Sequence, residues 1–204
     1  MRLLFTVDPE IEVPPLTYGG IERIVDVLVR RLRVEGHHVG LVAKAGSTCP
    51  ADEIFAWPGA HSQSVADTLA NMWTLRGVAR GFRPDVIHSF SRIAYLLPHL
   101  RGPVPIAMSY QREPTPRTVG LAARLAASDV LTFTGCSEYI ASRGRPAGGV
   151  WHGIPNFADT EALSFSPHVP ADAPLVFLSR VENIKGAHWA IEIARRSRRA
   201  LIIA

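Results

Sequence analysis

Short apolar runs alternate with helix-length segments along most of this sequence, and this alternation limits the folds that the chain can adopt. Residues 3–7 form a continuous apolar run that ends at Asp8 and Pro9, which is typical of a strand buried on both faces of a parallel sheet. Apolar residues then recur at helical spacing until Gly36 provides a stop: Ile21, Ile24, Val25, Leu28 and Leu32. The chain therefore begins with a strand followed by an amphipathic helix.

The same alternation continues through residue 155. A helix is predicted over residues 65–82. Further strands are predicted at residues 38–43, 54–57, 85–90, 104–109 and 130–134. Repeated βα units imply a parallel sheet with helices on both faces, so residues 1–155 are predicted to form a doubly wound, Rossmann-like α/β domain.

The pattern breaks from residue 151 onward, where prolines and small polar residues interrupt any period. We place a linker at residues 156–174. Residues 175–179 then form a new strand, residues 187–194 a helical face and residues 200–203 the start of another strand. A β-α-β piece of about 30 residues cannot close a core of its own, so residues 175–204 are predicted to be the incomplete start of a second domain.

Composition excludes several classes of protein. With 47% apolar and 20% charged residues in 204, the chain can bury a core and does not resemble a disordered segment. Its first apolar run is too short for a signal peptide, and no run approaches the 18 residues of a membrane span. The two cysteines, Cys49 and Cys136, lie far apart without metal-ligand spacing. We therefore expect a cytoplasmic protein.

The charge of the chain is weakly basic. A net charge of +4 along the whole length gives too weak a field to indicate nucleic-acid binding. The basic residues are nearly all Arg, which fits either anionic ligands or codon bias in a GC-rich genome. The run Arg195-Arg196-Ser197-Arg198-Arg199 could bind anionic lipid head groups, but a helix C-terminus attracts cations anyway, so peripheral membrane contact is not indicated.

Two loops that follow predicted strands carry candidates for anion binding. In the first loop, Gly19 and Gly20 precede a helix, where backbone N–H groups and the helix dipole favour an anion. Alternatively, the pair only makes a tight turn, and Glu22 only complements the dipole. Because there is no GxGxxG or GxxxxGK[ST] motif, dinucleotide and P-loop sites are disfavoured.

The second loop holds Arg180 and Lys185 on either side of a short segment that leads into a helix. Two cations at a helix N-terminus would converge with its dipole on a diphosphate. The alternative is that both are ordinary solvated surface charges, as most Lys and Arg residues are.

In their order along the chain, these two loops and several further motifs resemble glycosyltransferase family 4. The first loop, from Pro14 to Arg23, and the second, Ser179-Arg180 through Lys185-Gly186, both take part in the resemblance. The other motifs are Gly36-His37-His38-Val39, Pro84-Asp85-Val86-Ile87-His88, Cys136-Ser137-Glu138 and Gly153-Ile154-Pro155. The resemblance runs from end to end of the chain.

The resemblance implies a GT-B fold, with an acceptor-side domain at residues 1–155 and a donor-binding domain after it. It implies transfer of a sugar from a nucleotide-diphosphate donor, with retention and without a metal ion or other cofactor. Carried over, the residues that contact donor phosphate are Gly19, Gly20, Arg180 and Lys185. The acceptor is expected to be a carbohydrate, a lipid-linked molecule or a small molecule.

This sequence departs from the family at the position near the reacting sugar. The family usually has a His after the strand at 104–109, where this chain has Tyr110-Gln111-Arg112-Glu113. Gln111 can bond to a sugar hydroxyl but cannot take a proton, and His88 could replace the missing His or be structural. We keep Gln111 and His88 as candidate catalytic residues. The candidate acceptor-side residues, expected with them along one sheet edge, are Tyr18, Glu22, Tyr110 and Glu113.

The second departure is that the family's acidic donor-sugar motif would lie beyond Ala204. The 204 residues alone are therefore expected to be inactive, although they belong to an enzyme family. A rival hypothesis is a non-catalytic binding or partner module derived from the acceptor-side domain. Apolar residues of the tail, such as Val176, Leu178 and Ile191, would need a covering layer, so self-association through the tail is one expectation.

Overall fold

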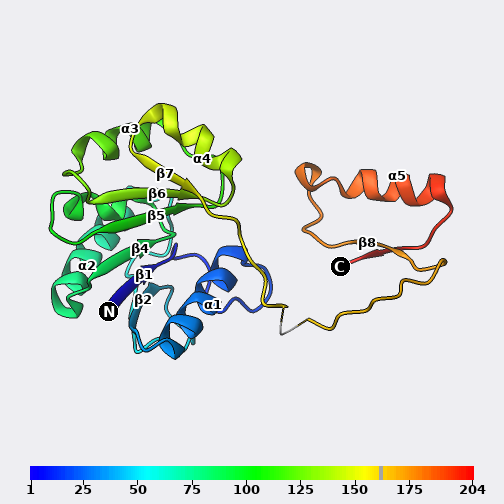
Figure 1. Cartoon of the computed structure of the whole chain (residues 1–204), viewed down its shortest axis with the longest axis horizontal. Helices are drawn as coiled ribbons and strands as arrows, with labels where there is room; N and C mark the ends of the chain where they lie inside the picture. Colours follow the sequence, from blue (N-terminus) through cyan, green and yellow to red (C-terminus); the bar gives the residue numbers. More distant parts are fainter. Residues whose placement is uncertain (161–162) are drawn as a thin grey trace. The chain divides into compact units, whose positions relative to one another are not determined.

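The computed structural model describes residues 1–160 and 163–204 and divides the chain into two compact units (Figure 1). Unit 1 is Met1–Ala158 and unit 2 is Asp159–Ala204. The linker predicted at residues 156–174 thus falls partly in each unit. Its residues 161 and 162 lie outside the described residues.

Unit 1 is built on a seven-stranded sheet with the order β3-β2-β1-β4-β5-β6-β7. All six neighbouring pairs are parallel. The strands are β1 (Arg2–Thr6), β2 (His38–Ala43), β3 (Glu53–Ala56), β4 (Val86–Ser89), β5 (Ile106–Tyr110), β6 (Leu131–Gly135) and β7 (Val150–Gly153). The chain runs outward from β1 to β3 and then returns to β4 on the other side of β1, which confirms the prediction of a doubly wound parallel sheet.

Helices cover both faces of this sheet, because alternate strand residues point to opposite faces. Leu4 of β1 joins the core cluster that includes Leu75, whereas the next residue, Phe5, joins the cluster that includes Val25 and Val29. The helical elements are α1 (Gly20–Val34), α2 (Val65–Phe82), the 3₁₀ helix η1 (Ile93–His99), α3 (Pro116–Leu125), α4 (Glu138–Gly144) and the 3₁₀ turn η2 (Arg145–Ala147). In the described part of the chain, no helix combines the length and apolarity needed to cross a membrane.

Local sequence signals place several helix ends. The Ser64 hydroxyl accepts a hydrogen bond from the Asp67 N–H at 3.2 Å and caps α2, and Ser137 caps α4 in the same way through the Ile140 N–H. After α1, Gly36 adopts φ 85°, a left-handed conformation that favours glycine.

The strand β7 differs from the sequence prediction, which assigned the segment from residue 151 onward to irregular chain. Val150–Gly153 pairs in parallel with β6. The Trp151 ring stacks on the Phe133 ring of β6, with centroids 4.7 Å apart. The buried Trp151 side chain and the pairing with β6 hold this segment extended at the sheet edge, just before Pro155.

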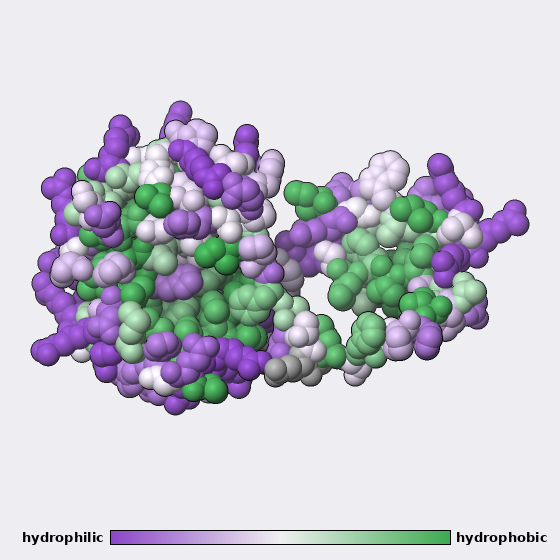
Figure 2. Space-filling view, viewed as in Figure 1, coloured by the Kyte–Doolittle hydropathy of each residue, from purple (hydrophilic) through white to green (hydrophobic). Residues whose placement is uncertain are grey.

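Unit 2 is much smaller. It contains β8 (Leu175–Phe177), the 3₁₀ turn η4 (Asn183–Lys185), α5 (Ala187–Ser197) and β9 (Leu201–Ile203), with β8 and β9 paired in parallel. Only Ala187 and Ala194 are buried apolar residues among those described in this unit. Figure 2 shows apolar side chains open at its surface, and Val176, Leu178 and Ile191 are all exposed.

Candidate functional site

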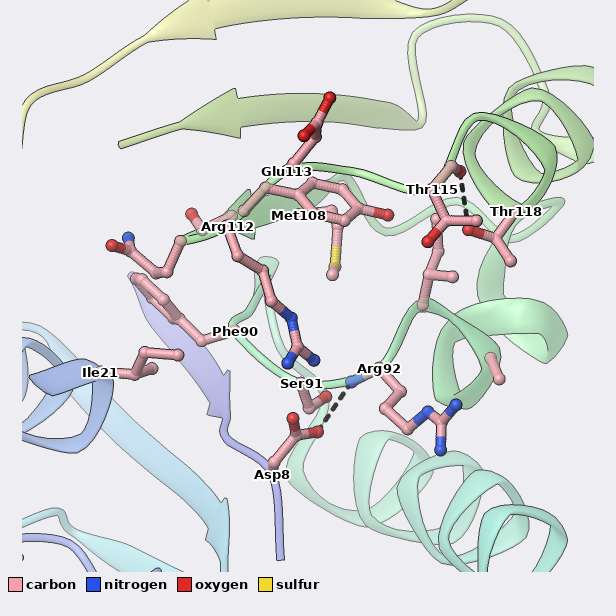
Figure 3. A pocket seen from close by; sticks show the side chains of 15 residues that line it. Asp8, Ile21, Phe90, Ser91, Arg92, Met108, Arg112, Glu113, Thr115 and Thr118 are labelled. Carbon is pink, nitrogen blue, oxygen red and sulfur yellow. Dashed lines mark hydrogen bonds between the residues drawn. The ribbon is translucent and has the colours of Figure 1, made fainter. Parts of the chain in front are cut away.

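A cavity of about 210 Å³ opens at the carboxyl ends of β1, β4 and β5 (Figure 3). Its walls come from the segments that follow these strands: Asp8 after β1, residues 90–94 after β4, and residues 110–113 at the end of β5 and after it. Ile21 of α1 and Thr118 of α3 complete it. This edge of a parallel sheet is where α/β folds bind their ligands.

Asp8 supplies a carboxylate to this cavity. Its Oδ1 accepts a hydrogen bond from the backbone N–H of Arg92 at 3.0 Å, which fixes the orientation of the side chain (Figure 3). Burial, with a contribution from Glu10, raises the pKa of Asp8 to about 6, against the opposing effect of Arg112 and Arg92. In the sequence, Asp8 marks the end of the first strand, and an acid at this place in a parallel sheet is also a signal for a site residue that the sequence prediction missed.

Arg112 supplies a guanidinium to the same space. Figure 3 shows it directed toward Ser91 and Asp8. It makes no hydrogen bond or ion pair with any residue that the structure describes. By contrast, Glu113 points away from both and pairs with Arg143, with Nε and Oε1 2.7 Å apart. Arg92 also lines the cavity, but Figure 3 shows its side chain extending away from Asp8. The charged groups directed toward one another in this space are therefore the Asp8 carboxylate and the Arg112 guanidinium.

Three buried hydroxyl groups form a hydrogen-bonded network that includes Ser91 of the cavity wall. The Thr6 Oγ1 lies 2.9 Å from the Ser89 Oγ and 2.8 Å from the Ser91 Oγ, and the two serine oxygens are 3.0 Å apart. Each hydroxyl both donates and accepts, so the three can satisfy one another without water. This network holds Ser91, which lines the cavity, in a fixed position.

The two candidate catalytic residues lie in different places. Gln111 lines the cavity, whereas His88 does not. The His88 Nε2 is 2.8 Å from the Ser109 Oγ, and its ring stacks on Phe90 with centroids 4.6 Å apart. Burial lowers the pKa of His88 to about 4, so the imidazole is neutral at pH 7. These contacts favour the hypothesis that His88 has a structural role over the hypothesis that it replaces the missing His.

The four candidate acceptor-side residues are only partly brought together. Tyr110 and Glu113 line the cavity, and burial raises the pKa of Tyr110 to about 12, so its phenol stays protonated. Tyr18 is exposed and Glu22 is buried, and neither lines the cavity. Tyr18 precedes α1 and Glu22 lies in its first turn, and it is Ile21 of the same turn that reaches the cavity.

The paired glycines of the first loop have different surroundings. A Cβ on Gly19 would lie 2.5 Å from the Pro15 Cβ and 2.9 Å from the Glu22 Oε2, so no larger residue fits without displacement. A Cβ on Gly20 would meet nothing within 4 Å. Of the two positions, only 19 requires glycine for packing. The space at Gly20 leaves the N-terminus of α1 open to a ligand.

Arg180 and Lys185 belong to unit 2. Arg180 lies after β8, and its Nη1 is 2.9 Å from the Glu182 Oε1. Lys185 is exposed, makes no ion pair with a described residue, and directly precedes Gly186, the N-cap of α5. In the described ranges, no three His, Cys, Asp or Glu side chains lie close enough together to hold a metal ion.

Comparisons with known proteins agree with this architecture. The family model described as Glycosyltransferase Family 4 matches residues 18–162. A search of curated proteins gives no match. A crystal structure of a glycosyltransferase from Rickettsia africae is similar to this chain, with a TM-score of 0.64, 16% identity, and coverage of 99% of this chain and 59% of that one.

Two further solved structures show the same fold. One is HepE from Anabaena in complex with UDP-glucose, with a TM-score of 0.62, 16% identity, and coverage of 100% of this chain and 59% of that one. The other is a sucrose-phosphate synthase from Thermosynechococcus elongatus, with a TM-score of 0.71, 12% identity, and coverage of 99% and 61%. The chain thus spans about three fifths of the length of these structures.

Proposed function

Because this chain belongs to glycosyltransferase family 4, we propose that it takes part in transferring a sugar from a nucleotide-diphosphate donor to an acceptor, with retention of configuration. In this proposal, unit 1 binds the acceptor, which is a carbohydrate, a lipid-linked molecule or a small molecule. The observation that carries the acceptor role is the cavity at the carboxyl ends of β1, β4 and β5, where Asp8, Gln111 and Arg112 meet.

The donor diphosphate would be held by Gly19, Gly20, Arg180 and Lys185. The leaving nucleotide gains negative charge as the glycosidic bond breaks, and cations and N–H dipoles already in place stabilise that charge. A guanidinium and an ammonium can supply this stabilisation without a metal ion or another cofactor. The open space around Gly20 supports this assignment, as does the exposed ammonium of Lys185, which forms no ion pair with a residue that the structure describes.

The proposal is tested by titrating the 204-residue chain with a panel of UDP-, GDP- and ADP-sugars. Lys185→Ala should weaken donor binding by about tenfold or more, because a charge-assisted bond to phosphate contributes about 1.5–3 kcal/mol. Gly20→Ala should also weaken it, because the added methyl group would occupy the open space at the helix N-terminus. The matched controls are Arg195→Ala, an exposed cation of α5, and Gly77→Ala, a helical glycine with equally open space.

Unchanged donor binding in Lys185→Ala would make Lys185 an ordinary surface charge. If no member of the panel binds to the parent chain, the proposed donor role of these residues fails. Both variants should keep the fold, because a Cβ on Gly20 meets no atom within 4 Å and the Lys185 side chain is exposed.

A second function, binding of a sugar without transfer, is favoured by one observation. The cavity contains Gln111 and no imidazole, and the His88 ring is held by Ser109 and Phe90 instead. Release of nucleotide diphosphate, together with a glycosylated product detected by mass spectrometry, would distinguish transfer from binding alone.

A further inference from the structure

We infer that the cavity of unit 1 binds a single uncharged sugar ring, whose neighbouring hydroxyl groups bridge the Asp8 carboxylate and the Arg112 guanidinium. The inference deepens the proposed function and rests on it, because this ring would be the acceptor or its terminal residue. It adds to the acceptor classes given above that the group held in the cavity is a neutral sugar ring.

The hydrogen-bonding capacity of the two side chains favours a pair of hydroxyl groups. An ionised carboxylate only accepts hydrogen bonds, and a guanidinium only donates them. One oxygen of Asp8 accepts a hydrogen bond from the Arg92 N–H, and no other described residue donates a hydrogen bond to this carboxylate. A hydroxyl both donates and accepts, so adjacent hydroxyls can donate to Asp8 and accept from Arg112 at once.

Other ligand classes match only half of this arrangement. A phosphate or carboxylate accepts hydrogen bonds only, so it would suit Arg112 but would face the negative charge of Asp8. An ammonium group would suit Asp8 and would face the positive charge of Arg112. The negative charges of Asp8 and Glu10 are balanced by the positive charges of Arg92 and Arg112, which all act on this part of the cavity. The balance favours a ligand without net charge.

The size and walls of the cavity fit a sugar ring better than a lipid chain. Its volume of about 210 Å³ is below the roughly 300–1,000 Å³ of sites for drug-sized ligands, so it would hold a single ring. Phe90, Ile93 and Met108 provide apolar surface for the C–H groups of the ring, and Ser91 lies on the polar side. Mixed walls of this kind suit a ring with polar edges and apolar faces.

The test is a titration of the 204-residue chain with neutral methyl glycosides of glucose, galactose, mannose and rhamnose, followed by saturation-transfer NMR. Asp8→Asn keeps an oxygen for the Arg92 N–H but replaces the other acceptor with a donor. This variant and Arg112→Gln should each weaken the glycoside that binds best by about tenfold or more. Asp129→Asn and Arg117→Gln remove equal charges from exposed positions outside the cavity and should leave binding unchanged.

Three results would overturn the inference. Tighter binding of glucose 6-phosphate or glucuronate than of the neutral glycosides, strengthened by Asp8→Asn, would make the cavity an anion site. Binding of none of the glycosides by the parent chain would exclude a sugar-ring site, and equal binding by the parent and both cavity variants would place the sugar elsewhere. Because the titration needs no nucleotide, and Lys185→Ala should leave it unchanged, failure of donor binding and failure of this inference are separate outcomes.

Discussion

Unit 1 and unit 2 are made of the same kinds of element, but they differ in how much of each element is hidden. In unit 1, seven strands have helices on both faces, and large side chains such as Phe5, Tyr95 and Phe133 are fully buried. In unit 2, two strands and one helix bury only two alanines among the described apolar residues. A β-α-β piece thus has the right local pattern but lacks the layers needed to bury both faces of its sheet.

The same contrast holds for charged groups. Asp8 and His88 of unit 1 are largely buried, and burial shifts the pKa of each. In unit 2, Arg195 and Arg196 pair with Glu192 at the end of α5 while more than three quarters of each Arg side chain stays exposed. Such pairs contribute little to stability.

Amide hydrogen exchange should differ most between the two units. Amides in β1, β4 and β5 should exchange only through openings that cost about 5 kcal/mol or more, which corresponds to protection of over about 10³-fold. Amides in β8 and β9 should be protected less than about tenfold, because little apolar surface is lost when this pair opens. Mass spectrometry of exchanged peptides measures both. Strong protection in β8 and β9 would show that something covers them, and self-association through unit 2 stays a prediction that this result would favour.

A pair of leucines tests the comparison by mutation. Leu4 is fully buried in β1, whereas Leu178, just after β8, is 80% exposed. Leu4→Ala should lower the free energy of unfolding by about 2–5 kcal/mol, because it removes buried methyl groups and leaves a cavity. Leu178→Ala makes the same chemical change and should alter it by less than about 0.5 kcal/mol. Urea unfolding followed by tryptophan fluorescence measures both, and equal losses would mean that Leu178 is buried in solution.

Much of unit 1 could be predicted from the sequence, because strands buried on both faces are continuous apolar runs. The predicted strand at residues 38–43 and helix at residues 65–82 have the bounds of β2 and α2. The strand β7 could not be predicted in this way. It is short, lies at the sheet edge, and is held by the contact between Trp151 and Phe133, which are far apart in sequence.

The site was predictable in location but not in detail. Tyr110 ends β5, and Gln111 and Glu113 follow it, and that position alone brings them to the ligand-binding edge. The orientation of Asp8 depends on the N–H of Arg92, 84 residues away, and no local pattern encodes this contact. Glu113 is drawn away by Arg143, which is also a tertiary contact. The sequence alone therefore could not predict that Asp8 and Arg112 would be the charged pair of the cavity.

The next prediction concerns the pH dependence of unit 1. The pKa of Asp8 is raised from 3.8 to about 6, so the folded state holds the extra proton and stability falls as pH rises from about 4 to 6. The pKa of His88 is lowered from 6.5 to about 4, so the unfolded state holds the extra proton and stability is lost as pH falls through this range. Each effect has a slope of about 1.4 kcal/mol per pH unit, and the two should largely cancel between pH 4 and 6.

Single variants should expose the two opposing slopes. Asp8→Asn leaves the His88 effect, so the variant should lose about 2–3 kcal/mol as pH falls from about 6 to 4. His88→Gln leaves the Asp8 effect, so this variant should gain a similar amount over the same interval. Urea midpoints measured across the range give both slopes. Parallel curves for the parent and the two variants would contradict burial of these groups.

The smallest expected effects compare the glycines at the starts of α1 and α5. Gly19→Ala should cost about 1–3 kcal/mol because its Cβ would collide with Pro15, and Gly20→Ala should cost almost nothing because the space there is open. Gly186 instead has φ 79°, and a Cβ there would meet the Trp189 Cδ1 at 3.6 Å, an ordinary contact, so Gly186→Ala should cost only about 1 kcal/mol, from backbone strain. Asn tolerates left-handed backbone, so Gly186→Asn should recover most of the loss, whereas Gly19→Asn should not. Urea unfolding measures the stability of the Gly19 and Gly20 variants, and amide exchange in α5 measures that of the Gly186 variants. Equal losses of stability for Ala and Asn at position 186 would show that the left-handed conformation is not what requires glycine there.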